Sequence, residues 1–247
     1  MSFVSISDVH IKDIGDENWL ILESFLDHPL TKQAKTIYFL GDIFDLLVGS
    51  YEEYYQTYKK FFEKVGALQR ENKRVVFVEG NHDFHFEKLV STYLPGSLYY
   101  ESKFIDIHFG KNIMFCHGDD IEIGNKGYKR YKRFVTSNFA RLLIDNILNF
   151  NILDTQGKNA SKKSRKRNKQ RYTQPDNQEW LKKRFREAAK IQFDKFGPDI
   201  IICGHSHIED NTYIDGKLFI NNGYVPISKK FIYGSEEGVK LISCVLD

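Results

Sequence analysis

Short apolar runs alternate with longer amphipathic stretches over the first part of the chain. The runs at residues 3–7, 36–40 and 74–79 are rich in β-branched and aromatic side chains, which is typical of buried strands. Between them, residues 17–27 and 51–71 carry apolar side chains at the spacing of a helix with one buried face. Strands that alternate with helices predict a parallel sheet with right-handed crossovers.

The pattern changes in the second half, where turn sequences separate neighbouring strand-like runs. Two hairpins are predicted, with Gly110-Lys111-Asn112 between residues 104–109 and 113–117, and with Asp215-Gly216 between residues 211–214 and 217–220. A helix is expected over residues 177–196, closed by Pro198, and a last strand over residues 239–246. The predicted sheet content is therefore mixed, with hairpins dominating the second half.

A basic segment lies between these two halves. Residues 126–171 carry a net charge of +12, whereas the remainder of the chain carries −9. Apolar side chains recur at helical spacing over residues 128–143, residues 142–153 are strongly apolar, and residues 158–171 hold eight Lys and Arg without an acid. Such asymmetry indicates a basic face with an anionic partner. The alternative is a solvated surface loop whose charge is incidental.

Length and composition bound the kind of protein. The chain has 247 residues and is 41% hydrophobic, enough for a sizeable core in one large domain or two small ones. No run approaches the length needed to span a bilayer, and the first residues run straight into a strand, so no signal peptide is expected. Cys116, Cys203 and Cys244 lie in apolar runs, which favours buried, reduced thiols and a cytoplasmic protein.

Five of the apolar runs end in side chains that can bind metals. These ends are Asp8-Val9-His10, Gly41-Asp42, Gly80-Asn81-His82-Asp83, His117-Gly118-Asp119 and Gly204-His205-Ser206-His207. One such end alone would be an ordinary turn, because Gly and Asn favour turns. Five are hard to explain by packing, and ligands of open α/β sheets bind outside the carboxyl ends of the strands. We therefore expect these ends to form one site.

The residue types at these ends indicate a metal centre. Imidazole together with carboxylate suits manganese, iron or zinc, whereas magnesium prefers oxygen ligands. Seven candidate ligands are too many for one tetrahedral ion, and they suit two ions about 3.5–4 Å apart with a bridging carboxylate. The candidates are Asp8, His10, Asp42, Asn81, His117, His205 and His207. The other histidines considered, His28, His85 and His108, are expected to be structural.

In their order along the chain, these groups resemble the signature of the calcineurin-like metallophosphoesterases. The resemblance covers residues 8 to 207 and implies a four-layer α/β/β/α sandwich, an α/β fold, for residues 1–247 as a single domain. It implies one divalent metal on Asp8, His10, Asp42 and His207, and a second on Asp42, Asn81, His117 and His205. It also implies that Asn81 and His82 contact the substrate phosphate, and that catalytic His82 is oriented by Asp83.

The second half resembles the lipid A pyrophosphohydrolases that cleave UDP-2,3-diacylglucosamine. The shared features are His117-Gly118-Asp119, a basic helical insert and the Gly-His-Ser-His end. This resemblance implies manganese, a helical lid over residues 122–175 that holds acyl chains, and a peripheral enzyme at the inner face of the cytoplasmic membrane. An anionic membrane surface would contact residues 126–171. The chain departs from these enzymes at His82, where they have arginine.

Two other functions remain open at this point. One is a soluble phosphomonoesterase or phosphodiesterase that acts on nucleotides. The other is a metal-binding scaffold without catalysis, against which the complete ligand set and the presence of His82 and Asp83 argue. No specific nucleic-acid partner is expected, because residues 158–171 lack the interleaved aromatic side chains on which bases stack.

Overall fold

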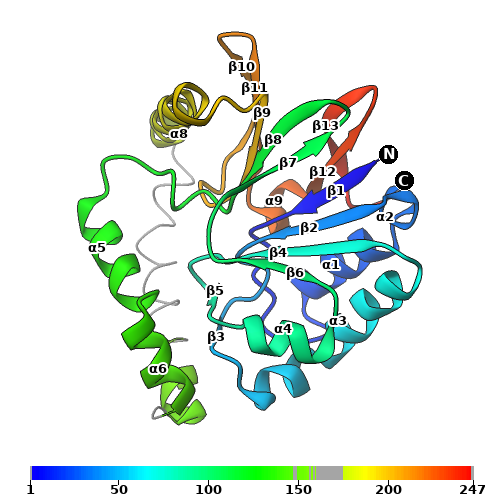
Figure 1. Ribbon diagram of the computed structural model, residues 1–247, viewed down its shortest axis with the longest axis vertical. Helices are drawn as coiled ribbons and strands as arrows, with labels where there is room; N and C mark the ends of the chain where they lie inside the picture. The colour runs from blue at the N-terminus through cyan, green and yellow to red at the C-terminus, as the bar shows by residue number, and fades with distance from the viewer. Residues whose placement is uncertain (1, 147–148, 156, 158, 160–174, 246–247) are drawn as a thin grey trace.

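Two β-sheets lie face to face in the chain, and helices cover their outer faces (Figure 1). The computed structural model describes residues 2–146, 149–155, 157, 159 and 175–245. The statements that follow concern these residues.

The first sheet combines a parallel core with an antiparallel edge. Its strands, in order across the sheet, are β13 (Gly238–Ser243), β12 (Lys230–Ser235), β1 (Phe3–Ile6), β2 (Thr36–Leu40), β4 (Arg74–Val78) and β6 (Leu98–Tyr100). Neighbouring strands from β1 to β6 run parallel, as the alternation of strands and helices predicted. β12 is antiparallel to both β1 and β13.

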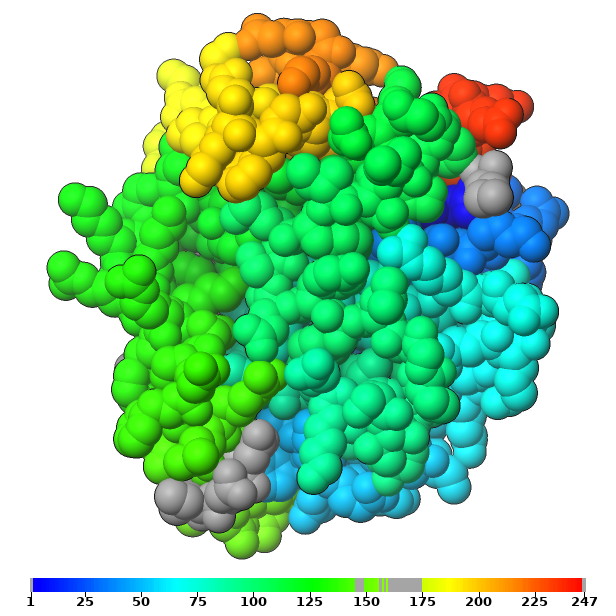
Figure 2. All heavy atoms as spheres, in the orientation of Figure 1, coloured from blue at the N-terminus to red at the C-terminus, as the bar shows by residue number. Residues whose placement is uncertain are grey.

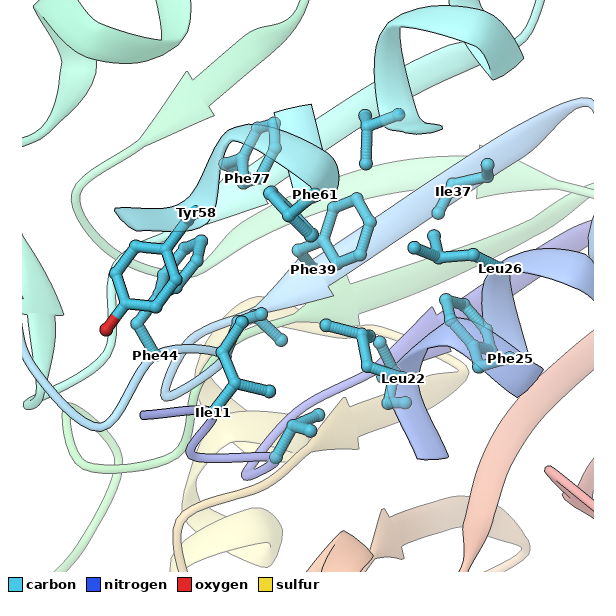
Figure 3. Close-up of a cluster of buried hydrophobic side chains, with 14 of the residues drawn as sticks. Ile11, Leu22, Phe25, Leu26, Ile37, Phe39, Phe44, Tyr58, Phe61 and Phe77 are labelled. Carbon is cyan, nitrogen blue, oxygen red and sulfur yellow. The ribbon is translucent and has the colours of Figure 1, made fainter. Parts of the chain in front are cut away.

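The helices on this sheet form where the apolar spacing predicted them. They are α1 (Glu17–Asp27), α2 (Pro29–Gln33), α3 (Glu52–Arg70) and α4 (Glu87–Tyr93). The side chain of Asp16 caps α1 by accepting a hydrogen bond from the backbone N–H of Trp19. Leu22 and Phe25 of α1 and Phe61 of α3 meet Phe39 of β2 in one buried cluster (Figure 3).

The second sheet is built around the two expected hairpins. Its strands, in order, are β10 (Glu209–Ile214), β11 (Lys217–Asn222), β9 (Ile200–Cys203), β8 (Lys111–Phe115) and β7 (Phe104–His108). Helix α8 (Pro175–Phe196) covers its outer face, where Phe185 and Ala189 pack against Met114 and Ile201. The expected helix over residues 177–196 is confirmed, with its start two residues earlier.

Alternate side chains of the strands fill the space between the two sheets. Tyr38 and Leu40 of the first sheet pack there with Phe115 and Ile202 of the second. Intervening residues such as Phe39 and Ile201 point to the helices instead. The order of layers is thus helix, sheet, sheet, helix, and the predicted four-layer α/β/β/α sandwich is confirmed.

One of the predicted turns is wrong in its length. The turn between β7 and β8 consists of Phe109 and Gly110 alone, with φ of 55° and 70°, which matches the twist of the flanking strands. Lys111 and Asn112 belong to β8 rather than to the turn. The second turn, Asp215-Gly216, has φ of 50° and 80° and is confirmed.

Several short elements were not predicted. Besides β12, they include α2, α4 and the helix α9 (Val225–Ser228). Two further short strands, β3 (Leu47–Val48) and β5 (Asp83–Phe84), pair in parallel. This pair ties the loop that follows β2 to the loop that follows β4. The last strand ends at Ser243, three residues before its predicted end.

The basic segment begins with two helices, α5 (Lys126–Val135) and α6 (Asn138–Asn146), which lie along one side of the sandwich (Figure 1). The predicted helical spacing over residues 128–143 is confirmed. Apart from residue 159, the basic run 158–171 lies outside the described residues. Among the residues described, no helix combines the length and the apolar character needed to cross a membrane. All three cysteines are buried and none forms a disulfide.

Candidate metal centre

The candidate ligands lie in the loops that follow five strands. Asp8 and His10 follow β1, Asp42 follows β2, and Asn81 follows β4 in the first sheet. His117 follows β8, and His205 and His207 follow β9 in the second sheet. The two sheets therefore bring their carboxyl ends to one place.

An unusual backbone conformation turns many of these side chains toward one another. Asp8, His10, Asp42, His205 and His207 have φ between 53° and 65°, the left-handed region that residues other than glycine rarely adopt. Hydrogen bonds fix this backbone, because the N–H of His205 donates to both oxygens of Asp8 at 3.0 Å. Strain of this kind clusters at functional sites.

One group of four side chains has the spacing of a metal site. The ligand atoms of Asp8, His10, Asp42 and His207 all lie within 4.8 Å of one another. Nε2 of His207 lies 3.3 Å from Asp8 Oδ1 and 3.4 Å from Nε2 of His10. Two carboxylates and two imidazoles at this spacing fit one divalent ion of the manganese, iron or zinc type.

Asp42 also faces a second group. Its Oδ2 lies 3.6 Å from Nε2 of His10 and 3.6 Å from Nε2 of His117. The same nitrogen of His117 lies 3.2 Å from Oδ1 of Asn81, and the ring of His205 lies 5.0 Å from the ring of His117. Nδ1 of His117 lies 2.9 Å from the carbonyl oxygen of Leu40, which leaves Nε2 for a ligand. The donor types of this second group would also suit a metal ion, and Asp42 faces both groups.

Comparison with known proteins identifies the family. The model of the calcineurin-like phosphoesterase family matches residues 1–209. The chain belongs to this family. This match confirms the expected resemblance to the calcineurin-like metallophosphoesterases and the expected fold class.

The individual relatives share about a quarter to a third of their residues with this chain. It is 32% identical to the UDP-2,3-diacylglucosamine hydrolase of Neisseria gonorrhoeae over 130 residues, 53% of each chain. It is 26% identical to the enzyme of that name from Haemophilus influenzae over 205 residues, 83% of this chain and 82% of the relative. The chain therefore spans about half the length of the first relative. A solved archaeal phosphodiesterase covers 98% of this chain and 99% of its own, with 12% identity and a TM-score of 0.49.

Charges within the candidate centre shift the pKa values of its acids. Burial raises the pKa of Asp8, but the contact with His207 and the charge of His117 outweigh burial and hold this pKa below its usual value. Burial and the neighbouring charge of Asp42 raise the pKa of Asp83 well above its usual value. A divalent ion would relieve the repulsion among such closely spaced carboxylates.

The carboxylate of Asp83 is held by backbone groups. It accepts hydrogen bonds from the N–H groups of Asp42 and Ile43, both at 2.7 Å, and from those of Phe44 and Gly80. Asp83 therefore fixes the loop that carries Asp42. That Asp83 orients His82, as the resemblance implies, stays a prediction.

His82 is half-buried beside the centre. Its Nδ1 lies 2.9 Å from the carbonyl oxygen of Asp45, and its backbone N–H donates to Oδ1 of Asp42 at 2.8 Å. Its ring meets that of His10 edge-on, with centroids 4.8 Å apart. Ligand atoms of His10, Asp45 and His82 also lie within 4.8 Å of one another. The structure thus places His82 next to the first group of ligands.

Some residues of the centre were not singled out from the sequence. Asp45 is buried, with Oδ1 4.0 Å from Nδ1 of His10, and Tyr224 stacks on the ring of His207 at 4.9 Å. Glu122 is buried with Oε2 3.7 Å from Nε2 of His205. Asp45 stands close to Asp42 in the sequence and could have been found. Glu122 and Tyr224 lie beyond the strand-end motifs and gave no comparable signal.

The histidines expected to be structural have structural contacts. Nδ1 of His28 accepts the hydrogen bond that caps α2, from the N–H of Leu30. Nε2 of His108 lies 2.6 Å from the hydroxyl of Tyr38, between the two sheets. Nε2 of His85 lies 2.9 Å from the carbonyl oxygen of Val135 at the end of α5.

Helix α5 is held against the centre by a buried carboxylate. Oδ2 of Asp119 accepts a hydrogen bond from the hydroxyl of Tyr128 at 2.7 Å and pairs with Nζ of Lys132 at 2.5 Å. Burial opposes the charge of Asp119, yet Lys132 and nearby histidines lower its pKa. The ring of Tyr128 lies 5.8 Å from that of His205. The start of the basic segment is therefore part of the surroundings of the metal centre.

An apolar group lies under α6, which we call the lid-side cluster. It consists of Leu46, Val48, Phe84 and Ile144, with Tyr51, Val135 and Leu153 packed against it. Leu46 and Phe84 directly follow Asp45 and Asp83, so the cluster adjoins the loops that carry the ligands. In the space-filling view, α5 and α6 (green) form one edge of the face shown, below α8 (yellow) (Figure 2).

Proposed function

We propose that this chain is a dinuclear-metal hydrolase that cleaves the pyrophosphate of UDP-2,3-diacylglucosamine. The products are 2,3-diacylglucosamine 1-phosphate, which is lipid X, and UMP. The observation that carries the chemistry is the group Asp8, His10, Asp42 and His207, whose ligand atoms lie within 4.8 Å of one another. The names of the relatives and the exposed apolar side chains of α5 and α6 support the substrate.

In this proposal one ion is held by Asp8, His10, Asp42 and His207. The other ion is held by Asp42, Asn81, His117 and His205. Manganese is the proposed metal, because its preferred ligands include both imidazole and carboxylate, and iron and zinc share that preference. When bound, two such ions supply an activated water and offset the negative charge of the phosphoryl oxygens.

The residues around the ions bind and orient the phosphate. His82 lies beside the centre with a half-buried ring, so it can hold a phosphoryl oxygen and give a proton to the leaving phosphate. Asn81 presents its amide next to it. Arginine at this position, as in the resembling enzymes, would supply charge but would not release a proton. Asp83 and Asp45 position these groups through the loops that they hold.

We further propose that residues 122–175 form a lid inserted in a single domain that spans residues 1–247. The lid-side cluster is itself buried and packs α6 against the loops that carry Asp45 and Asp83. In this proposal the acyl chains bind to the apolar side chains that remain 57% to 62% exposed on α5 and α6, which are Tyr131, Phe134, Phe139 and Leu142. Acyl chains would cover them in the complex.

The charge of the same segment supports a membrane partner. α5 carries five Lys and Arg residues and no acid, next to the exposed aromatic side chains. Basic side chains near an anionic leaflet contribute about 1 kcal/mol each, and salt weakens this effect. We therefore propose a peripheral enzyme at the inner face of the cytoplasmic membrane, in contact with anionic headgroups through residues 126–171.

The test of the chemistry uses the full-length chain freed of metal by a chelator. Manganese should restore the release of UMP from UDP-2,3-diacylglucosamine, and Asp42→Ala should abolish it because Asp42 faces both groups of ligands. Asp27→Ala, an exposed acid on α1, is the control and should behave as the unmodified chain. Unchanged turnover in Asp42→Ala would remove the dinuclear assignment.

The test of the substrate separates the lipid enzyme from a nucleotide phosphoesterase. A Gly/Ser linker replaces residues 138–171, so that the contacts of Tyr128 and Lys132 with Asp119 are kept. Cleavage of the lipid substrate should be lost and salt-sensitive sedimentation with anionic vesicles should weaken, because α5 keeps its five basic residues. Hydrolysis of bis(p-nitrophenyl) phosphate should persist. Retention of both lipid-dependent properties would favour a nucleotide phosphoesterase. The presence of His82 in place of arginine also favours that alternative.

A further inference from the structure

The side chain of Glu122 lies between a candidate metal ligand and an arginine of helix α8. Its Oε2 is 3.7 Å from Nε2 of His205, and its Oε1 is 2.8 Å from Nη2 of Arg184. The side chain of Glu122 is buried and that of Arg184 is partly buried, with 8% and 13% of their surfaces exposed. A chain of contacts therefore runs from the centre through Glu122 to α8.

We propose that Glu122 and Arg184 position His205 for the second metal ion, and that they couple binding of this ion to the docking of α8. The inference rests on the proposed dinuclear centre. It assigns Glu122 and Arg184 as positioning residues, since they act through His205.

The argument begins with the two nitrogens of the His205 ring. A neutral imidazole carries one proton, and it can ligate a metal only through the other nitrogen. The carboxylate of Glu122 faces Nε2 and therefore favours the proton on that atom. This leaves Nδ1 as the ligating nitrogen. A carboxylate on the far nitrogen also makes the ring a more basic ligand and holds its orientation.

Arg184 fixes the carboxylate in turn. A buried carboxylate without a partner would be costly, and the guanidinium neutralises it. Nε of Arg184 also donates to the carbonyl oxygen of Ile123 at 2.5 Å, so the same side chain fixes the backbone next to Glu122. The guanidinium lies over the ring of Trp180, 5.2 Å from its centroid, which limits its movement on the outer side.

Helix α8 therefore reaches the centre by two routes. Arg184 acts through Glu122, and Phe185, the next residue, lies with its ring 6.2 Å from that of His205. Phe185 also packs in the core between α8 and the second sheet. If docking of α8 strengthens binding of the ion, then binding of the ion must stabilise docked α8 by the same factor. Both directions of this coupling are measurable.

Direct ligation by Glu122 is the competing role for this carboxylate. The two roles predict opposite effects of removing Arg184. If Glu122 positions His205, loss of the arginine loosens the carboxylate and weakens binding of the second ion. If Glu122 were itself a ligand, loss of its competing partner would leave the affinity for the ion unchanged or raise it.

The experiment compares Glu122→Gln and Arg184→Met with the full-length chain. Arg186→Met is the matched control, because Arg186 lies on the same helix and pairs with Asp210 instead. Manganese bound per chain is measured by equilibrium dialysis and elemental analysis. We expect one of the two ions to bind about 10- to 100-fold more weakly in both variants, the usual effect of losing such a partner of a metal-bound histidine. The other ion and the control should be unaffected.

Two further measurements distinguish positioning from simple loss of structure. In the zinc-loaded chain, nitrogen-15 spectra of the histidine rings should show His205 protonated at Nε2, and this signature should weaken in Glu122→Gln. Hydrogen exchange in α8 should slow when manganese is added to the unmodified chain and respond much less in Arg184→Met. Circular dichroism spectra that match those of the unmodified chain establish that both variants fold.

The possible outcomes separate this inference from the proposed function. If the unmodified chain binds two ions and both variants bind them with unchanged affinity, the positioning role is wrong and the dinuclear centre stands. Tighter binding in Arg184→Met would assign Glu122 as a ligand and overturn the inference. If the unmodified chain binds no metal, the proposed function itself fails.

Discussion

The carboxylate of Asp83 accepts a hydrogen bond of 2.7 Å from the backbone N–H of Asp42. Asp83 is the first residue of the short strand β5, shortly after the end of β4, and Asp42 follows β2. This bond therefore joins the ends of two neighbouring strands. Because Asp42 faces both groups of candidate ligands, the position of its carboxylate depends on a residue that belongs to neither group.

Replacement of Asp83 by alanine should therefore damage both stability and metal binding. The change leaves the N–H groups of Asp42, Ile43 and Phe44 buried without this acceptor, and each orphaned group costs about 1–3 kcal/mol. Denaturant unfolding of the metal-free chain should show a loss of at least this size. Asp83→Asn, which keeps one acceptor oxygen, should lose less. Equal stability of both variants and the unmodified chain would contradict this view of Asp83.

Replacement of Gly80 by alanine should displace Asp42 from the centre. A Cβ atom at Gly80 would lie 2.2 Å from Oδ1 of Asp42 and 2.4 Å from its backbone nitrogen, closer than atoms can approach. Gly66→Ala on α3 is the control, because its Cβ would meet its nearest neighbours at 3.5 Å and 3.6 Å. We expect Gly80→Ala to lose bound manganese, measured per chain, and Gly66→Ala to keep it. Normal metal content in Gly80→Ala would refute the close approach.

Replacement of His82 by alanine should separate catalysis from metal binding. We expect the variant to retain both ions and to lose about 10²–10⁴ in the rate of hydrolysis, the range typical of a general acid. Metal content and single-turnover rates measure the two effects independently. A fall in bound metal together with the rate would instead make His82 a ligand, in the group that it forms with His10 and Asp45.

Asp106 should make the fold sensitive to acid. Burial raises the pKa of Asp106, but hydrogen bonds from Tyr38 and Arg74 outweigh burial and lower it. A lowered pKa stabilises the fold above the pKa of the unfolded chain, about 3.9, and this contribution is lost as the pH falls through the folded pKa. Unfolding by urea should therefore show Asp106→Asn less stable than the unmodified chain at pH 7, with the difference shrinking as the pH falls below about 3.9.

Tyr38→Phe is the companion variant for this prediction, because it removes one of the two side-chain donors to Asp106. It should lose part of the same acid sensitivity. Parallel pH profiles for both variants and the unmodified chain would show that Asp106 contributes nothing to acid unfolding.

Local patterns carried most of the prediction of the fold. The apolar spacing of Leu22, Phe25 and Leu26 is visible within a few residues, and the helix that it predicted, α1, has the expected bounds. The pairing of β12 with β1 was not predicted, because it joins distant parts of the chain. Gly234 faces Phe3 in that pair, and a Cβ atom there would lie 2.3 Å from the ring. Such a requirement is apparent only when both strands are in place.

The same distinction applies to the candidate centre. Metal-binding side chains at strand ends could be found because the chemistry and the strand are adjacent in sequence. The role of Asp83 in holding the loop of Asp42 could not be predicted from the sequence. Its partners are backbone N–H groups, which every residue type except proline carries. Glu122 was missed for a related reason, because its partners lie far along the chain, His205 in the loop after β9 and Arg184 in α8.

The left-handed backbone of the candidate ligands also bears on how such a protein evolves. Asp8, His10, Asp42, His205 and His207 each hold a conformation that costs a side-chain-bearing residue roughly 1–2 kcal/mol and costs glycine little. Selection for catalysis must therefore maintain the centre against a steady gain in stability from glycine substitutions. A descendant released from that selection would acquire glycines at these positions first. It would then lose the candidate metal ligands while keeping its fold.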